Sequence, residues 1–459
     1  MATRTLTLPR ISGERGRVLR LALPAVGEQF LNLLVGLVDT FLVGHLAVQA
    51  AARLGYGSAE ALAAVGLSGY VIWATTTLFI AAAVGATALI ARASGAQDQA
   101  DANAAMRQGL LLGGLMGLLA FFIIGTFASQ IMRGFGAPPE VLPLGVQYLR
   151  TTSYSMVGAA FLFVGNAALR GAGDTRTPLL VMLFVNGLNI VTAALLVNGT
   201  WGLPTLGVQG TALGAALGRG LGGVLVLLIL VRGRSGLKLD RIPGPDWSMI
   251  KRLIKVGLPA AGEQLAFQGA LVIFARVITG LGTVAFAAHN TVITIESISF
   301  LPGQGFALAA TTLVGQGLGA ENVKGARWSG NEAFRQAVVF MGLMGLAFVL
   351  VPGWFLRLMV SDPAVVAAGI TPLRTVGIIQ PLLGANFVFS GALRGAGDTR
   401  FPLWVKLFSP WLLRLPLAFL LVPYLGLTGA WIAMSLDLAL QGALSWRRFH
   451  GNRWEHIRV

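Results

Sequence analysis

The sequence predicts an all-α polytopic membrane protein with twelve transmembrane helices in two six-helix lobes, on the strength of three observations. Hydrophobic residues make up 55% of the 459 residues and charged residues only 11%, whereas soluble domains carry about 25% charged residues. The apolar residues form runs of about 20 residues or more, the length of a helix that crosses a bilayer. Motifs of the first half of the chain recur in the second half, which divides the spans into two equal sets.

The composition excludes several classes of protein. A mean hydropathy of +0.75 excludes a soluble enzyme and a disordered chain, and the absence of cysteine excludes a disulfide-bonded scaffold. The net charge of +16 would suggest nucleic-acid binding in a soluble protein, but here we expect no nucleic-acid partner and an attraction to anionic membrane lipids. The four histidines lack metal-binding spacing and no phosphate loop is present, so we expect no enzyme and no cofactor.

Twelve spans follow when the chain is divided at its charged clusters and its Gly/Pro turns. The expected spans are 18–46, 60–91, 104–131, 142–169, 178–197, 206–231, 253–279, 284–317, 326–351, 365–393, 402–422 and 426–446. The chain is accordingly expected to comprise a cytoplasmic N-terminal segment (1–17), an N-terminal lobe (18–231), a cytoplasmic linker (232–250), a C-terminal lobe (251–446) and a cytoplasmic tail (447–459).

Basic residues indicate the orientation of these spans. If the N-terminus is cytoplasmic, most of the 34 Lys and Arg residues fall in cytoplasmic segments, as the positive-inside rule requires. The longest of these segments carries Arg232, Arg234, Lys238, Arg241, Lys251, Arg252 and Lys255. We therefore expect a multi-pass protein of the inner (plasma) membrane with both termini in the cytoplasm and no cleaved signal peptide.

An internal repeat relates the two halves. The nine residues 168–176 recur unchanged at 392–400, an offset of 224, and residues 23–29 recur with one change at 258–264, an offset of 235. The difference predicts an insertion in the first half around residues 49–58. Because both halves start on the same side of the membrane, they are expected to be related by an axis along the membrane normal. In the repeated turn, Asp174 and Asp398 are expected to cap the following helices.

Taken together, the repeated motifs resemble those of a known family, the multidrug and toxic compound extrusion (MATE) transporters, especially the bacterial DinF-like branch. The resemblance extends over about residues 15–445 and rests on Leu23–Gln29, Val38-Asp39-Thr40, Ala63–Leu67, the doubled Arg-Gly-Ala-Gly-Asp-Thr and Gly426–Trp431. It implies a cation-coupled exporter whose two lobes flank a central cleft. Such proteins expel amphipathic, often cationic, compounds in exchange for protons or sodium.

Asp39 is the sharpest candidate among the acids inside the spans, because ionisable residues within a membrane usually mark function. It lies in an apolar stretch, and its repeat partner is Phe274, so the duplication does not explain its presence. Burial disfavours the ionised carboxylate, as a reversible proton carrier requires. The resemblance makes Asp39 the coupling residue and Pro24 the position where the first span bends; the alternative is a hydrogen-bonded structural acid.

The resemblance also places a polar face of the fifth span opposite that carboxylate. Asn186, Asn189 and Thr192 are the residues expected to complete the cation-coupling site. Ala193 occupies the position where many relatives carry a second acid, which favours a proton over sodium, although the three neutral side chains leave sodium possible. An acid pair that some relatives carry in the second half is absent. Gln268 lies near the first of its positions and is a candidate substrate or gate residue.

The remaining intramembrane acids receive weaker interpretations. Glu28 and Glu263 are repeat partners and are expected to act as gate or packing residues. Glu296 belongs to one half only and is a candidate for contact with substrate or a second proton. Asp437 is expected to form a structural ion pair with Arg414 on the preceding span, since the two lie at similar depth.

The leading functional prediction is a proton-coupled multidrug exporter that works by alternating access, in which helix 1 bends at Pro24 when Asp39 is protonated. The expected partners are small amphipathic or cationic molecules and membrane lipids, and the expected state is a monomer. The alternative is a lipid-linked precursor flippase of the same superfamily, which calls for a cationic central cavity. The sequence offers three deep intramembrane cations for such a cavity: Arg219, Arg276 and Arg414.

Overall fold

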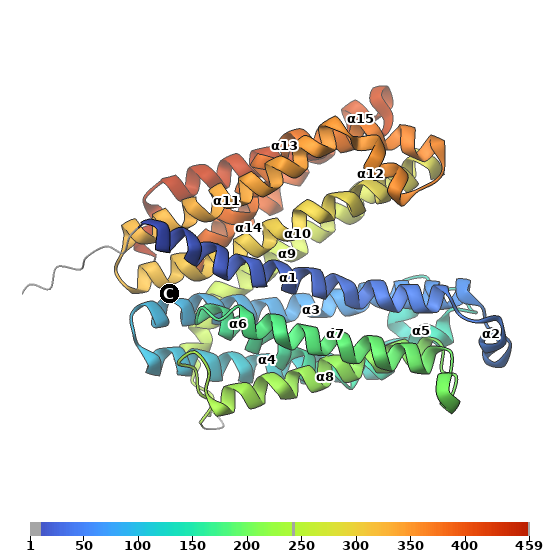
Figure 1. Ribbon diagram of the computed structural model, residues 1–459, viewed down its shortest axis with the longest axis horizontal. Helices are drawn as coiled ribbons and strands as arrows, with labels where there is room; N and C mark the ends of the chain where they lie inside the picture. The colour runs from blue at the N-terminus through green and yellow to red at the C-terminus, as the bar shows by residue number, and fades with distance from the viewer. Residues whose placement is uncertain (1–10, 241–243, 458–459) are drawn as a thin grey trace, which may run out of the picture. The chain divides into compact units, whose positions relative to one another are not determined.

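The computed structural model describes residues 11–240 and 244–457. In that part of the chain every secondary-structure element with a label is a helix (Figure 1). The first half contains α1 (Ile11–Gly44), α2 (Val48–Leu54), α3 (Ser58–Gly95), α4 (Gln99–Gly134), α5 (Leu142–Ser153), α6 (Met156–Gly171), α7 (Arg176–Val197), η1 (Thr200–Gly202) and α8 (Val208–Arg232). The second half contains α9 (Trp247–Thr279), α10 (Thr283–Gly319), α11 (Val323–Leu350), α12 (Pro352–Met359), α13 (Pro363–Gly395), α14 (Arg400–Ser409), η2 (Pro410–Arg414), α15 (Leu415–His450) and η3 (Arg453–His456).

These helices account for the twelve predicted crossings. Among the described residues, ten helical segments are long and apolar enough to span a membrane, and α5 with α6 forms an eleventh span bent by 56°. The segment Arg400–His450 has 51 residues, about 76 Å of helix, which is more than twice the hydrocarbon thickness of a bilayer. It is interrupted at Gly426, whose φ of 54° is left-handed, and therefore supplies two spans.

Two compact units make up the described chain. One unit comprises Gly27–Leu265, and the other comprises the residues up to Val26 together with those from Ala266 onward. The unit boundaries therefore fall inside α1 and α9, close to Pro24 and Pro259. The first spans of the two sequence repeats thus each contribute residues to both units.

The predicted insertion in the first half is confirmed. In the first half α1 is followed by the short helix α2, whose C-cap Gly55 has a φ of 74°. In the second half α9 and α10 are joined directly by the three residues 280–282. The extra residues therefore form α2 and leave the two flanking spans intact.

The repeated sequence motifs make the same contacts in each unit. The Thr87 hydroxyl donates to the Ala167 carbonyl at 3.0 Å, and its repeat partner Thr311 donates to the Gly391 carbonyl at 2.8 Å. Hydroxyl groups of this kind join neighbouring helices where lipid provides no hydrophobic driving force. The repeat thus preserves helix-to-helix hydrogen bonds as well as sequence.

The first copy of the repeated turn caps the following helix, as predicted. For the second copy the predicted cap by Asp398 is not formed among the described residues, and both copies bind an arginine. In the first unit described, Asp174 accepts hydrogen bonds from the Thr177 amide at 2.9 Å and from Arg234 Nε at 2.8 Å. In the other unit its repeat partner Asp398 accepts from Arg448 Nε at 2.7 Å. Each turn is therefore fixed to an arginine near the end of the last span of its own half.

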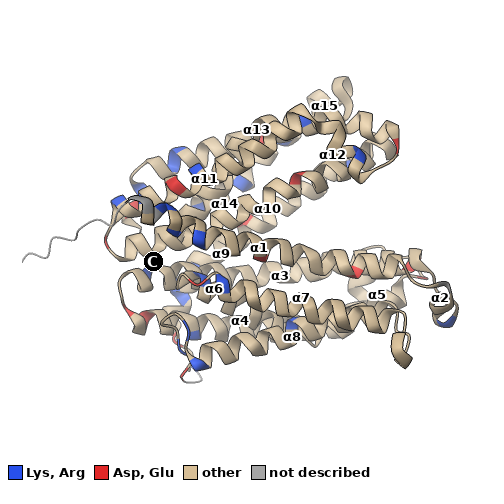
Figure 2. Cartoon of the chain, viewed as in Figure 1, with Lys and Arg blue, Asp and Glu red and all other residues tan. Residues whose placement is uncertain are grey.

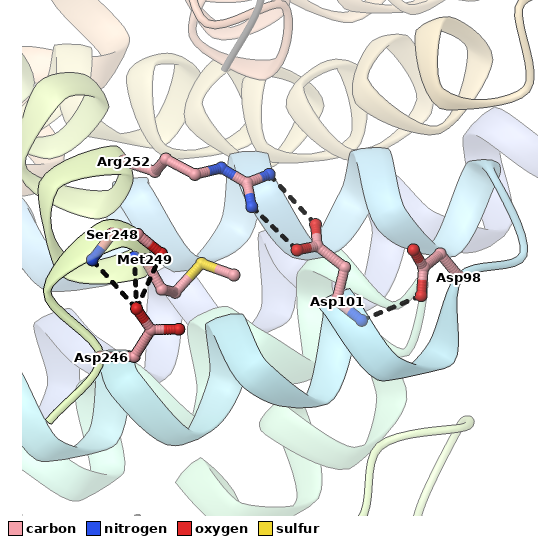
Figure 3. Close-up of polar contacts among 6 residues, drawn as sticks. All are labelled: Asp98, Asp101, Asp246, Ser248, Met249 and Arg252. Atoms are coloured by element: carbon pink, nitrogen blue, oxygen red, sulfur yellow. Dashed lines mark hydrogen bonds and ion pairs between the residues drawn. The ribbon is translucent and has the colours of Figure 1, made fainter. Parts of the chain in front are cut away.

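Charged residues are sparse along the helices, and within each unit most Lys and Arg residues gather at one end (Figure 2). Figure 3 shows a polar cluster at such an end of the Gly27–Leu265 unit. Arg252 of α9 makes a bidentate ion pair with Asp101 of α4 at 2.8 and 3.1 Å, and Asp98 caps α4. Asp246 caps α9 through the Ser248 amide at 2.9 Å. The Arg252–Asp101 ion pair anchors this capped start of α9 to α4.

Candidate functional site

Asp39 lies inside the Gly27–Leu265 unit, near the end of α1. Its side chain is only 3% exposed, whereas its helix neighbours Leu37 and Phe41 are more than half exposed. A helix that faces lipid on one side buries the residues of its opposite face, and Asp39 occupies that buried face. The sequence-predicted acid is thus enclosed by protein and does not face lipid.

Three other helices supply the partners of the Asp39 carboxyl. Asn189 of α7 donates from Nδ2 to Asp39 Oδ1 at 3.3 Å. The hydroxyl of Tyr148, a buried residue of α5, interacts with the same carboxyl, and Arg219 of α8 attracts it electrostatically. The carboxylate therefore has one hydrogen-bond donor, a polar hydroxyl and one nearby positive charge, which together offset part of the cost of burying it.

The polar face of α7 carries the other residues that the resemblance assigned to this site. Asn186 lies one turn from Asn189 and donates from Nδ2 to the Met182 carbonyl at 2.9 Å. Thr192 lies one turn further along and is half-buried. Among the described residues the amide oxygens of Asn186 and Asn189 are buried and have no hydrogen-bond partner. The site thus holds two acceptor oxygens that remain available.

Sequence reasoning missed Tyr148 and Arg219 as partners of Asp39. Tyr148 precedes a break between α5 and α6, where the hydroxyl groups of Thr152 and Ser155 bond back to nearby carbonyls at 2.9 and 2.8 Å. Such bonds compete with the helix and bend it. The available signals were the Thr-Thr-Ser-Tyr-Ser run for this break and the isolation of Arg219, a lone cation in an apolar span.

Glu28 lies nearer the start of α1 than Asp39, in the same unit, and binds Arg170 of the repeated turn motif. Its carboxylate pairs with Arg170 Nη1 of α6 at 2.5 Å, and the Glu28 side chain is 3% exposed. Its repeat partner Glu263 is also buried, on α9. Pro24 and Gln268 are both half-buried, on α1 and α9 respectively. The Glu28–Arg170 pair was not anticipated, although both residues belong to repeated motifs.

The other unit contains the predicted pair of Arg414 and Asp437, and the prediction is confirmed. Arg414 Nη2 lies 2.7 Å from Asp437 Oδ2, and the two side chains are 1% and 0% exposed. Ser409 and Gln441 donate to the same carboxylate. Glu296 of α10 is buried in this unit as well. Among the described residues there is no group of three or more His, Cys, Asp or Glu side chains able to hold a metal ion.

Comparison with known proteins fits this arrangement. The MatE family model matches residues 24–195 and 259–420, which is most of each half of the chain. The chain belongs to the MatE family. The two separate matches coincide with the internal repeat, so each half carries the family pattern by itself.

Two relatives match this MatE chain over most of its length. A protein of Thermotoga maritima named "Probable multidrug resistance protein NorM" is 33% identical over 446 residues, covering 96% of this chain and 93% of the relative. "Uncharacterized transporter YisQ" of Bacillus subtilis is 24% identical and covers 94% of this chain and 93% of its own.

Solved structures share the fold. One described as MATE in the straight conformation matches with a TM-score of 0.85 over 95% of both chains at 24% identity. A multidrug and toxic compound extrusion fold of two six-helix lobes is therefore the architecture of this chain.

Proposed function

We propose that this chain is a secondary active multidrug exporter, which expels amphipathic or cationic organic compounds in exchange for protons, with Asp39 as the coupling carboxylate. The observation that carries the proposal is the buried Asp39 carboxyl with Asn189 as its hydrogen-bond donor, the Tyr148 hydroxyl as a polar partner and Arg219 as the nearby cation. The name of the Thermotoga maritima relative supports the substrate class. The narrower assignment to the DinF-like branch stays a prediction.

The location proposed for this exporter is the inner (plasma) membrane, where it acts as a monomer with both termini in the cytoplasm. Within each unit the Lys and Arg residues gather at one end of the helices, as Figure 2 shows, which supports a cytoplasmic location for that end of the unit. Small amphipathic or cationic molecules and the surrounding lipids are the partners in this proposal.

The charges around Asp39 explain how proton and drug exchange for one another. With Asp39 ionised, Asp39 and Arg219 together carry no net charge, and an organic cation gains from the carboxylate. Protonation removes the negative charge and leaves Arg219 without its counter-ion, so the same site repels a cation. The proton and a cationic drug therefore compete for one carboxylate, and this competition couples their movements.

Pro24 gives α1 a position at which it can bend. Proline lacks the amide hydrogen that would bond to the Arg20 carbonyl, so the helix is weakened there. The unit boundary in α1 lies between Val26 and Gly27, next to this weak point. Structures of a fold relative are described as bent and straight conformations of MATE, which supports the proposal of a bending step.

Sodium is the competing coupling ion, and two observations bear on it. The unpartnered amide oxygens of Asn186 and Asn189 are neutral ligands of the kind a hard cation accepts. Asp39 is, however, the one carboxylate among the residues placed at the site, whereas dedicated sodium ligation is helped by more than one charged oxygen. Protons therefore remain our first choice, and the experiment below tests both ions.

The charges disfavour the alternative flippase, which needs unneutralised cations in its cavity. Arg414 is ion-paired with Asp437, Arg219 interacts with Asp39, and Arg276 lies on an exposed face of α9. A fold relative from Pyrococcus furiosus is described as having a binding pocket of reverse polarity that suggests a different function. The polarity of the site, and not the fold, therefore separates the two functions.

Drug efflux from proteoliposomes tests the proposal. Ethidium serves as the cationic probe, and an imposed proton gradient or sodium gradient serves as the driving force. We expect proton-driven ethidium transport by the wild type and its loss in Asp39→Asn, because the amide cannot exchange a proton. The control is Thr40→Ala, the next residue on α1, whose side chain faces outward. Equal proton-driven transport by Asp39→Asn and the wild type would exclude Asp39 as the coupling residue.

A further inference from the structure

Three buried ionisable side chains from three helical elements lie inside the unit that contains the described residues from Ala266 onward. Glu296 lies on α10, Arg414 ends the π-helical turn η2, and Asp437 lies on α15. Their exposed fractions are 8%, 1% and 0%. This cluster is separate from the Asp39 site, which lies in the other unit, and the proposed function makes no use of it.

Arg414 and Asp437 form a closed pair within this cluster. Besides the contacts to Arg414, the Asp437 carboxylate accepts a hydrogen bond from Gln441 Nε2 at 3.0 Å. The Arg414 guanidinium also lies over the ring of Phe274, 5.7 Å from its centroid. The pair is thus electrically neutral, hydrogen-bonded and packed, which is the condition under which two buried charges persist.

Glu296 has no such partner. Among the described residues its carboxyl makes no hydrogen bond and no ion pair within 4.0 Å, although its side chain is more than nine-tenths buried. Arg414 acts on it electrostatically from outside contact distance, and Arg414 Nη1 is itself buried without a hydrogen-bond partner. An ionised Glu296 therefore adds one uncompensated negative charge to a neutral pair, which is costly in a buried setting.

The repeat shows that this cluster was built in one half only. At the offset of 224, the partners of Glu296, Arg414 and Asp437 in the first half are the apolar residues Ile72, Ile190 and Leu213. An inherited duplication therefore does not account for any of the three charges.

The same comparison aligns the cluster with the Asp39 site. Phe274, the ring beneath Arg414, is the repeat partner of Asp39. Leu413, which precedes Arg414, is the repeat partner of Asn189. The second unit thus holds a cation, Arg414, next to the residue that corresponds to Asp39.

We propose that Glu296 is a second proton-binding residue, specific to the C-terminal half, and that Arg414 of the neutral Arg414–Asp437 pair attracts its ionised form. A bound proton neutralises the one uncompensated charge of the cluster, and Arg414 favours the ionised form enough for the proton to leave again. This proposal goes beyond the proposed function, which requires Asp39 alone. The π-helical turn that carries Arg414 is of a kind often found at functional sites.

Other charged groups around α10 leave Glu296 as the titrating member. His289 lies two turns along the same face of α10 and contacts the rings of Phe274 and Trp431. The buried residues of α12 and α13 are all uncharged, and Asp437 is the buried acid of α15. Arg276 of α9 is exposed. Glu332 of α11 is paired with Arg335 and lies about 20 Å from Glu296 along the helix axes by the rise per residue.

Infrared difference spectroscopy of the full chain in liposomes tests this proposal, because a protonated carboxyl has its own C=O band. Titration is carried out above about pH 5.5, where exposed carboxyls are ionised. We expect two titrating carboxyl bands in the wild type, loss of one in Glu296→Gln and loss of the other in Asp39→Asn. Glu332→Gln is the matched control, a buried but ion-paired acid of the same unit, and it should retain both bands.

Two further variants cover the case in which Glu296→Gln does not fold. Glu296→Asp keeps a carboxyl and should move one band without removing it. Arg414→Leu combined with Asp437→Leu removes the neutral pair, and the Glu296 band should then persist to more alkaline pH. Retention of both bands unchanged in the Glu296 variants would overturn the proposal while leaving the role of Asp39 intact. Transport provides the complementary distinction: loss of coupled transport in Asp39→Asn but not in Glu296→Gln would confine coupling to Asp39, as the proposed function states.

Discussion

Asp174 shows how a single side chain fixes a membrane-edge turn. Its carboxyl accepts hydrogen bonds from the amide and hydroxyl of Thr177, from Arg234 and from Ser235. Burial by itself raises the pKa of Asp174, but the hydrogen bonds from Thr177 and Arg234 outweigh burial and hold the pKa below its ordinary value of 3.8. A carboxyl with a lowered pKa in the folded protein stabilises the fold at neutral pH and loses that contribution on acidification.

The first prediction concerns this carboxyl. Its contribution is complete above its ordinary pKa and disappears as the pH falls through the lower pKa of the folded state. We therefore expect Asp174→Ala to lower the stability of the detergent-solubilised protein at pH 7 by about 1 kcal/mol, the usual value of a helix cap. Thermal unfolding should show a smaller difference between variant and wild type below about pH 3. A difference that does not change with pH would contradict the assignment.

At the same scale, the sequence revealed the acid of the candidate site but only part of its surroundings. Asp39 stood out because an isolated carboxyl in an apolar run is costly and lacks a repeat partner. Asn189 was found through resemblance. Tyr148 and Arg219 were missed because the contacts between α1, α5 and α8 depend on tertiary packing, and the spacing of residues along one helix carries no information on which other helix it faces.

At the scale of the element, close helix contacts depend on glycine. A Cβ atom on Gly171 would lie 2.8 Å from the Thr87 carbonyl oxygen, and on its repeat partner Gly395 it would lie 2.0 Å from the Thr311 oxygen. Both distances are below normal contact, so the helices must separate to accept any side chain. The hydrogen bonds of Thr87 and Thr311 span these same two contacts.

The second prediction follows from these contacts. Gly171→Ala and Gly395→Ala should each lower stability by about 1–3 kcal/mol, the range for overpacking, with the larger loss at Gly395 because its contact is shorter. Thermal unfolding in detergent measures both. Gly187→Ala on α7 is the matched control, since a Cβ there meets nothing within 4 Å. Stability equal to that of the control at both positions would show that the helices are not in backbone contact.

The spans themselves were predictable because length and hydropathy suffice to identify a membrane helix. Irregularities inside them were not. The break between α5 and α6 depends on serine and threonine hydroxyls within a mostly apolar run, and the π-helical turn at Pro410–Arg414 lies inside a span predicted as regular. Hydropathy averages over these residues, whereas local hydrogen bonding decides their conformation.

At the scale of the whole molecule, the loop between α8 and α9 separates the repeats but not the packing units. Arg17 of α1 donates to Gln316 at 2.8 Å in one unit, and Arg252 of α9 binds Asp101 in the other. A chain cut in that loop therefore leaves each fragment without a helical segment that its unit requires.

The third prediction tests this exchange of segments. Each fragment expressed alone, residues 1–240 or 241–459, should be degraded or should aggregate, because its main unit lacks part of a span. Co-expression should restore a complex that co-purifies and transports ethidium. The full chain with a protease site in the same loop serves as the control. A stable, monomeric fragment on its own would show that each half packs independently.

The exchange of segments also sets the timing of biosynthesis. Arg17 leaves the ribosome 299 positions before its partner Gln316, and at about 5–20 residues per second that interval is about 15–60 s. During this time the start of α1 is already in the membrane without the helices that bury its inner face. The unit to which it belongs is completed only as the last spans are inserted. A chain interrupted before Leu265 therefore leaves both units unfinished, and one interrupted later leaves the unit that contains the start of α1 unfinished.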